Sequence, residues 1–206
     1  MHREALTKDG SALVPAFSAF PEFYLAGGTA LALQIGHRVS VDFDFFTPEA
    51  LSRRLLYKVG NIFANEPLAP LVNNADQLTI LIRGVKVTFL TYPFPVIEPL
   101  VMRGDLSMLS VREIGATKAY TIGRRGTFKD YVDLYCIVSG GHASLVDVVR
   151  LADRKFGDAF NSRLFAEQLL FMDDVRDYEV EFLTKPIAAK TIASFFRKEV
   201  RGLPLA

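Results

Sequence analysis

The chain has 206 residues, 50% of them hydrophobic, and carries 24 basic against 23 acidic residues for a net charge of +1. This length and composition predict a globular protein with a sizeable core, organised as one large domain or two small ones. The near-zero charge excludes an overall basic field directed at nucleic acid or anionic membranes, so any phosphate-binding surface must be local.

The cysteine content and the first residues of the chain bear on the cellular compartment in which the protein is expected. A single cysteine, Cys136, excludes a disulfide framework and suits a reducing environment. The opening MHREALTKDG is polar where a signal peptide needs an apolar segment. No apolar run approaches the ~18 residues of a membrane span. We therefore expect a cytoplasmic protein.

Strand and helix signals alternate in the first half of the chain. Two strand-like runs meet at Arg83-Gly84, which predicts a hairpin. Thr47 before Pro48 has the form of a helix N-cap and predicts a helix from about 48 to 64. The other expected elements are strands FYLAG (23–27), VDFDFF (41–46), LTILIRG (78–84) and VKVTFLTY (85–92), helix TALALQI (29–35), and a core containing Phe17, Phe20, Phe23, Phe43, Phe45 and Phe89.

After Ser110 the helical pattern continues to the end of the chain. The expected helical segments are VREIGATKAYTIGRR, TFKDYVDLYCIVS, SLVDVVRLADRKF, NSRLFAEQLLFM and KPIAAKTIASFFRKEV. We expect an α/β (α+β) fold, in which residues 1–110 form an α/β core with a small mixed sheet and flanking helices. Residues 111–206 are expected to form a helical part.

Asp42 and Asp44 lie one residue apart in the predicted strand 41–46. Because successive side chains of a strand alternate, both aspartates project from one face, and Phe43 and Phe45 project from the other into a core. Two carboxylates about 7 Å apart repel each other, so a cation between them is favoured, and magnesium or manganese is the natural candidate. A solvated strand face is the alternative for an isolated pair.

A double glycine, Gly27-Gly28, separates a predicted strand from a predicted helix, and thirteen residues lie between it and Asp42. Glycines at this place permit a tight turn whose N–H groups and helix N-terminus face an anion. A plain strand-to-helix turn is the alternative for a double glycine alone. The combination with Asp-apolar-Asp is more specific than its parts, and it predicts a site for a metal-held phosphate.

The order apolar-Gly-Gly, a gap, then Asp-apolar-Asp-apolar resembles the signature of the DNA polymerase β-like nucleotidyltransferase superfamily. The string GGTALALQIGHRVSVDFDFF (27–46) is similar to the AbiEii group within it, the nucleotidyltransferase toxins of bacterial toxin–antitoxin and phage-defence systems. A second segment, KAYTIGRRGTFKDYVDLYCI (118–137), resembles that group's downstream lysine, arginines and Asp-x-x-Asp helix.

This resemblance implies an enzyme that moves an NMP from an NTP to an acceptor, either tRNA or another RNA, or a protein hydroxyl. Asp42 and Asp44 would hold Mg²⁺ or Mn²⁺ and be catalytic, while Gly27, Gly28 and Thr29 would cradle the triphosphate. The helical part would close the nucleotide cleft, and a cognate antitoxin would be a protein partner.

His37 and Arg38 lie shortly before Asp42, where a loop could direct them at phosphates. For Arg38, assigned to the nucleotide-binding set, a phosphate contact and a surface ion pair both remain open. His37 is interpreted as structural.

Lys118 falls on the apolar stripe of its predicted helix, where a charge needs an anionic partner. That partner could be a triphosphate or the Asp42–Asp44 pair, and the matching lysine of the family is expected near the nucleotide. A snorkelling lysine is the alternative. Asp130 is assigned to the catalytic set in preference to Asp133, with helix capping as its alternative.

One position departs from the superfamily pattern. A third acidic residue is expected on a neighbouring strand, where VKVTFL presents Thr88, an uncharged and poor magnesium ligand. Asp130 or Glu98 could substitute in space, or the site could bind nucleotide without turning it over. The leading hypothesis is therefore a nucleotidyltransferase. The alternative is a catalytically degenerate nucleotide- or partner-binding regulatory module, and a structural protein without a ligand is a third hypothesis.

Overall fold

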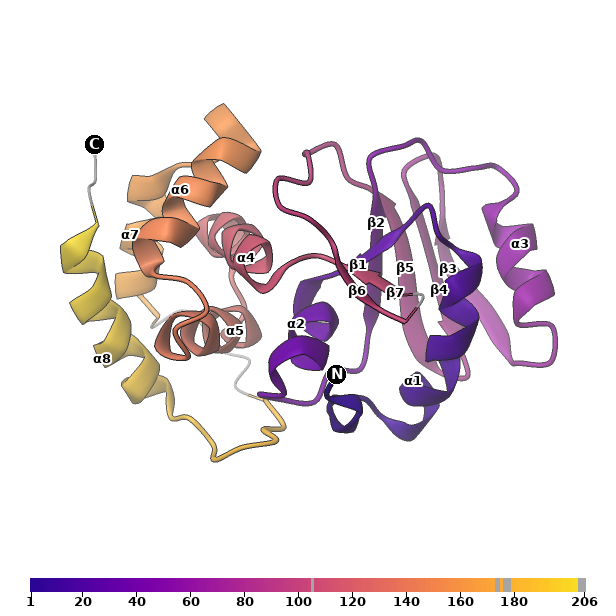
Figure 1. Cartoon of the computed structure of the whole chain (residues 1–206), viewed down its shortest axis with the longest axis horizontal. Coiled ribbons are helices and arrows are strands. Elements are labelled where there is room, and N and C mark those ends of the chain that lie inside the picture. Colours follow the sequence, from indigo (N-terminus) through magenta and orange to yellow (C-terminus); the bar gives the residue numbers. More distant parts are fainter. Residues whose placement is uncertain (105, 173–174, 176–178, 204–206) are drawn as a thin grey trace. The chain divides into compact units, whose positions relative to one another are not determined.

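The chain folds into two compact units. The computed structural model describes residues 1–104, 106–172, 175 and 179–203. Unit 1 comprises Met1–Pro95 and Pro99–Leu109, and unit 2 comprises Val96–Glu98 and Ser110–Ala206. The strands lie in unit 1 together with several helices, whereas unit 2 is built of helices (Figure 1). The predicted α/β class with a helical second half is confirmed.

Unit 1 is built on a mixed sheet with the strand order β3-β4-β5-β2-β1-β7-β6. The pairs β2–β5 and β1–β7 are parallel, and the others are antiparallel. The central strand β2 therefore lies between β1 and β5. The strands are β1 (Tyr24–Ala26), β2 (Phe43–Thr47), β3 (Leu68–Asn73), β4 (Gln77–Ile82), β5 (Val85–Thr91), β6 (Val101–Arg103) and β7 (Leu106–Met108).

An aromatic core covers one face of this sheet. The ring of Phe17 lies with its centroid 4.9 Å from that of Phe43 and 4.7 Å from that of Phe45, and Phe20 lies 5.0 Å from Phe89. Such spacings are favourable for aromatic pairs. The predicted core phenylalanines Phe17, Phe20, Phe23, Phe43, Phe45 and Phe89 are all buried. The helices of unit 1 are η1 (Arg3–Ala5), α1 (Lys8–Leu13), η2 (Val14–Ala19), α2 (Gly27–Ile35) and α3 (Leu55–Ile62).

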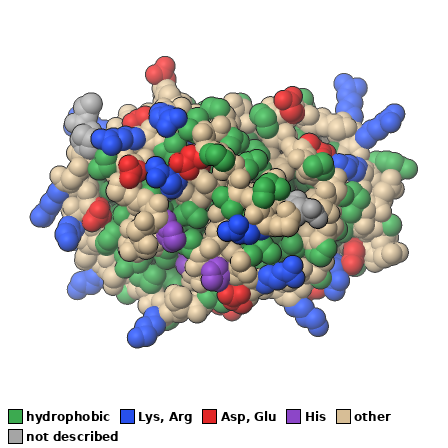
Figure 2. Space-filling model, in the orientation of Figure 1, with side chains coloured by type: hydrophobic (Ala, Val, Ile, Leu, Met, Phe, Trp, Pro, Cys, Tyr) green, Lys and Arg blue, Asp and Glu red, His purple; other side chains and the backbone are tan. Residues whose placement is uncertain are grey.

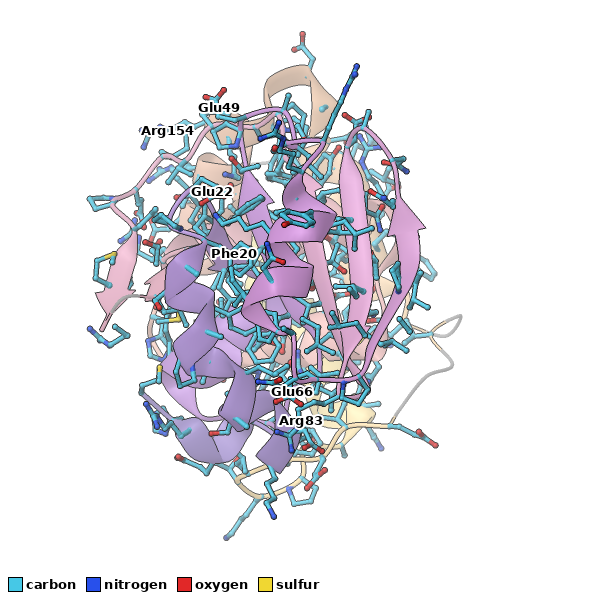
Figure 3. All side chains as sticks on the ribbon, turned by 90° about the vertical axis from the view of Figure 1, so that its right-hand side faces the viewer. Phe20, Glu22, Glu49, Glu66, Arg83 and Arg154 are labelled. Atoms are coloured by element: carbon cyan, nitrogen blue, oxygen red, sulfur yellow. The ribbon has the colours of Figure 1, made fainter. Side chains whose placement is uncertain are left out.

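The predicted hairpin between β4 and β5 is confirmed. Arg83 and Gly84 connect the strands with φ angles of 53° and 81°, the two positive values that a type I′ turn requires. Arg83 also forms ion pairs with Asp9 of α1 at 3.1 Å and with Glu66 at 3.4 Å. Glu66 and Arg83 lie side by side in Figure 3. These ion pairs connect the turn to α1 and to the segment before β3.

The prediction of a helix from about 48 to 64 is wrong about the residue at which the helix begins. Thr47 is the last residue of β2, paired in register with Thr91, and its carbonyl accepts a hydrogen bond from the Tyr92 amide at 2.7 Å. The sheet therefore takes the residue that the local pattern assigned to a helix cap, and α3 begins only at Leu55.

Three strands were absent from the sequence-based prediction. β3 contains Pro70, which cannot donate to a ladder, and its side chains are mostly exposed because it is an edge strand. β6 and β7 span three residues each. Sequences this short or this polar carry no clear period, so only their pairing partners identify them.

The helices of unit 2 have well-formed N-termini. The Ser110 hydroxyl accepts from the Glu113 amide, and Thr127 with Asp130 and Ser144 with Asp147 form capping boxes. Each helical segment expected after Ser110 contains one of the α-helices found here. The helices are α4 (Val111–Arg125), α5 (Phe128–Ser139), α6 (Leu145–Phe156), η3 (Gly157–Ala159), α7 (Ser162–Leu170), α8 (Ala189–Glu199) and η4 (Val200–Gly202).

A buried ion pair organises the start of unit 2. The side chains of Glu113 and Lys155 are both completely buried, and Lys155 Nζ lies 2.7 Å from Glu113 Oε1. The Glu113 carboxylate also accepts hydrogen bonds from the amides of Ile97 and Glu98, each at 2.9 Å. A buried carboxylate is tolerated when it is paired in this way. These bonds explain why Val96–Glu98 belongs to unit 2 although β6 and β7 follow it.

None of the described helices is long and apolar enough to cross a membrane. On the face shown in Figure 2, Lys and Arg side chains are scattered among acidic and apolar ones. This distribution agrees with the near-zero net charge.

The hairpin turn generates a stability prediction. Gly84→Ala should lower the free energy of unfolding by about 1 kcal/mol, because φ at this position is 81° and an L side chain rarely adopts it. An added Cβ would meet no atom within 4 Å, so the cost is conformational rather than steric.

Gly60→Ala is the matched control, since Gly60 has equally open space but lies inside α3. It should be neutral or stabilising by up to about 1 kcal/mol. Urea unfolding of both variants checks the pair, and an equal loss of stability in both would contradict the turn assignment.

Candidate functional site

Asp42 and Asp44 lie at the start of the central strand of unit 1. Asp44 is paired with Ala26 of β1 on one side and with Thr88 of β5 on the other, and Asp42 directly precedes β2. Phe43 is completely buried and the two aspartates are partly exposed. The pleat therefore directs both carboxylates to the face opposite the aromatic core.

The glycine turn lies directly against Asp44. Gly27 opens α2 with a φ of 66°, and a Cβ added to it would come within 3.2 Å of Asp44 Oδ2. The backbone angle therefore favours glycine, and a side chain at this position would also crowd the Asp44 carboxylate. The N-cap residue Ala26 has no side-chain oxygen to offer to the first N–H groups of α2, and these groups form the positive end of the helix dipole. Such an end favours an anion such as phosphate.

The Thr29 hydroxyl is hydrogen-bonded to the segment that leads into β2. Its hydroxyl donates a hydrogen bond to the Asp42 carbonyl and lies 2.7 Å from the hydroxyl of Ser40. Thr29 and Ser40 are both buried. The Thr29 side chain therefore holds the segment that enters β2 in place, and its role toward a triphosphate stays a prediction.

Arg38 and His37 lie between α2 and β2 and are each 5% exposed. The Arg38 guanidinium donates to the Val39 carbonyl at 3.0 Å. Arg38 therefore does not lie exposed on the surface, and the choice between an ion pair and a phosphate contact stays open. The phosphate contact stays a prediction.

Lys86 is the residue of this region that the sequence-based reasoning missed. Its Nζ lies 2.7 Å from Asp42 Oδ2, with the two side chains 42% and 38% exposed. The hydrogen bond to Asp42 raises the pKa of Lys86, partial burial opposes this, and the charges of Asp42 and Asp44 add to the rise. The alternation of VKVTFL placed Lys86 on the same face as Thr88, but nothing local indicated which strand would lie beside it.

Thr88 lies directly opposite Asp44 in the parallel β2–β5 pair. Its hydroxyl is 3.3 Å from that of Thr79 on β4. Glu98, one proposed substitute for a third carboxylate, accepts from the Ser110 hydroxyl at 2.6 Å and pairs with Arg112 at 3.0 Å, all within unit 2. Among the residues that the structure describes, no three His, Cys, Asp or Glu side chains gather into a metal-binding group.

Lys118, Asp130 and Asp133 form a buried cluster in unit 2. Lys118 Nζ lies 2.8 Å from Asp130 Oδ1 and 2.6 Å from Asp133 Oδ2, and the Asp133 side chain is completely buried. Asp130 Oδ2 accepts from the Thr127 amide and hydroxyl. The anionic partner that Lys118 needs is therefore supplied by α5, and the snorkelling alternative is wrong. A role for Lys118 and Asp130 at the nucleotide stays a prediction.

The chain is similar to known proteins over most of its length. The family model "Nucleotidyl transferase AbiEii toxin, Type IV TA system" matches residues 12–204. The chain belongs to the AbiEii family. The resemblance expected from the sequence is thereby confirmed, and membership places the chain among the nucleotidyl transferase toxins of type IV toxin–antitoxin systems.

Individual proteins and solved structures also match most of this chain. The Aquifex aeolicus protein aq_aa25 is 30% identical over 97% of this chain and 94% of its own length. MenT4, a nucleotidyltransferase toxin from Mycobacterium tuberculosis, has a TM-score of 0.59 at 17% identity, over 98% of this chain and 88% of that one. A putative nucleotidyltransferase from H. pylori gives 0.50 at 18% identity, over 77% and 72%. At such low sequence identities, the similarity to these two solved structures shows a shared fold and no more.

The donor set around Asp42 is compatible with a divalent cation of the kind this family uses. Magnesium typically takes one or two carboxylates and completes its shell with water and substrate phosphates. Asp42 and Asp44 share one face and are partly exposed, so their oxygens fit that requirement. Lys86, which already pairs with Asp42, competes with such a cation for the same oxygens.

The buried cluster of unit 2 generates a prediction for Lys118. Lys118→Met removes the ammonium group 2.6 Å from the completely buried Asp133 carboxylate, and it should lower the free energy of unfolding by about 3–5 kcal/mol. Lys190→Met, at an exposed position on α8, is the control and should change stability by less than about 0.5 kcal/mol.

The double variant Lys118→Met/Asp133→Asn tests the cause, because it removes the buried negative charge of Asp133 together with the ammonium group. Chemical unfolding should show that a large part of the lost stability returns. Nucleotidyl transfer should stay low if Lys118 contacts nucleotide. Transfer that returns together with stability would contradict that role.

Proposed function

We propose that this AbiEii-family chain transfers an NMP from an NTP to an acceptor hydroxyl at a site formed by Gly27, Gly28, Asp42 and Asp44, with Mg²⁺ or Mn²⁺. The observation that carries the proposal is the contact between the Gly27 turn and Asp44. This contact joins a helix N-terminus, whose N-cap residue has no capping side chain, to a pair of carboxylates on one face of a strand. Phosphate and metal ligands are thereby adjacent.

In this proposal, different parts of the site bind the metal ion and the phosphate group. Asp42 and Asp44 would hold the divalent cation, which when bound supplies positive charge to the phosphate oxygens. The N-terminus of α2 receives a phosphate group, and Gly27 admits it because no side chain covers the turn. The acceptor hydroxyl loses its proton to water as its oxygen forms a bond to the α-phosphorus. The bond from the α-phosphorus to the bridging oxygen breaks, and pyrophosphate leaves with that electron pair.

Position is the main contribution of the protein in such a reaction. The strand β2 and the bonds from Thr29 keep the Asp42 segment fixed relative to the helix N-terminus. A rigid arrangement reduces the entropic cost of bringing the α-phosphate and the acceptor together. We propose tRNA or another RNA, or a protein hydroxyl, as the acceptor. A cognate antitoxin is the proposed protein partner, on the basis of the family description.

A degenerate, nucleotide-binding regulatory module is the second candidate function. The observation that favours it is Thr88 opposite Asp44, where the superfamily resemblance predicts a third carboxylate. A binding module would be stabilised by nucleotide without label transfer. Incubation with α-labelled NTPs, Mg²⁺ or Mn²⁺, and total RNA or protein separates the two functions by whether label moves to an acceptor.

Asp44→Asn tests the transfer reaction. The variant keeps the size of the side chain and removes one ligand charge, so label transfer should fall by about 100-fold or more while the protein stays folded. Circular dichroism and the melting curve report the fold, and labelled acceptor on gels reports transfer. Retention of transfer within a few-fold of the wild type would remove Asp44 from the catalytic set.

Thr88→Asp tests the missing third carboxylate. Because Thr88 faces Asp44 in register, the added charge should increase Mn²⁺ affinity by about tenfold. Thr88→Asn is the matched control, with similar shape and no charge, and it should leave Mn²⁺ affinity unchanged. Titration calorimetry measures both variants, and equal affinities for Asp and Asn would show that β5 does not contribute to the metal site.

A further inference from the structure

β5 brings a lysine to the carboxylate pair. The register Phe43–Val87 and Asp44–Thr88 places Lys86 one position before Val87, beside Asp42. Lys86 is on the same face as Thr88, since residues two apart on a strand share a face. Its Nζ contacts Asp42 Oδ2 at 2.7 Å. The strand that carries threonine in place of a third carboxylate therefore also supplies a cation.

The net charge of Asp42, Asp44 and Lys86 limits how many metal ions these side chains can bind. The two carboxylates and the ammonium of Lys86 sum to one negative charge. Two-metal sites hold their ions about 3.5–4 Å apart, where the mutual repulsion of four positive charges must be offset by ligands. Asp42, Asp44 and Lys86 together carry one net negative charge, and one oxygen of Asp42 is already paired with Lys86. These side chains therefore offset little of the repulsion between two metal ions.

We propose that the Asp42–Asp44 pair binds a single divalent cation and that the ammonium group of Lys86 takes the place of a second metal ion. In this arrangement Lys86 supplies the second positive charge that contacts the nucleotide phosphates. The inference rests on the proposed function, because it assumes that this pair binds metal. The 42% exposure of the Lys86 side chain leaves its ammonium accessible to an anionic ligand as well as to Asp42. Lys86 is thus a binding and positioning residue for the phosphates.

Mn²⁺ titration of the full chain, followed by the electron paramagnetic resonance signal of free Mn²⁺, tests the inference without relying on activity. Wild type should bind one Mn²⁺ per chain. Lys86→Met removes the competing cation and should bind Mn²⁺ on the order of tenfold more tightly. Lys86→Arg keeps the charge and should resemble wild type, and Lys8→Met, an exposed lysine on α1, is the matched control.

A second measurement examines the phosphate contact. Lys86→Met should raise the KM for the NTP by about tenfold, with a smaller change in kcat, and Lys86→Arg should restore most of it. Two bound Mn²⁺ in wild type, or equal Mn²⁺ affinity in wild type and Lys86→Met, would overturn this inference while leaving the proposed function intact. Absence of Mn²⁺ binding in wild type, Lys86→Met and Thr88→Asp alike would overturn both.

Discussion

The alternation of Phe and Asp along β2 is the constraint on which the rest of unit 1 depends. Phe43 and Phe45 contact the aromatic core formed with Phe17, while Asp42 and Asp44 remain on the other face. A slip of one residue would exchange the faces, expose two phenylalanines and bury two carboxylates. Burial of a Phe side chain is worth about 1.5–3 kcal/mol, and an unpaired buried charge costs more. The core therefore determines where the carboxylates lie.

Short-range contacts then hold the carboxylates against the helix N-terminus. The φ of Gly27 and its closeness to Asp44 are both satisfied by glycine, and the Thr29 hydroxyl holds the Asp42 carbonyl. These contacts involve β1, α2 and β2, which follow one another in the sequence, and β1 and β2 are antiparallel neighbours in the sheet. The candidate site is thus largely a local structure supported by a distant core.

Unit 2 shows how a helical bundle accommodates charge in its interior. Glu113 pairs with Lys155, and Lys118 pairs with Asp130 and Asp133, with further hydrogen bonds to backbone groups or hydroxyls. Buried ion pairs of this type contribute little net stability compared with apolar residues, but removal of one partner is costly. Glu113 also fixes the segment Val96–Glu98, so its charge has a structural role. Lys118 has both a structural engagement and a proposed contact with nucleotide.

The sequence by itself determined the elements whose signals are local. These are the strands β1 and β2, the helix after Gly27, the hairpin at Arg83-Gly84 and the capped helices that follow Ser110, all read from periodicity and turn chemistry within a few residues. It also determined that Asp42 and Asp44 share a face, because a strand has a period of two whatever its neighbours are.

Only the tertiary structure decided which strands are neighbours. The parallel pairing of β2 with β5 brought Lys86 to Asp42, the sheet extended to include Thr47, and packing buried Arg38. Parallel neighbours are joined through long crossover connections, and their register depends on the packing of the whole sheet. A local pattern therefore contains no information on the residue opposite, and the cation beside the carboxylates became visible only in the folded chain.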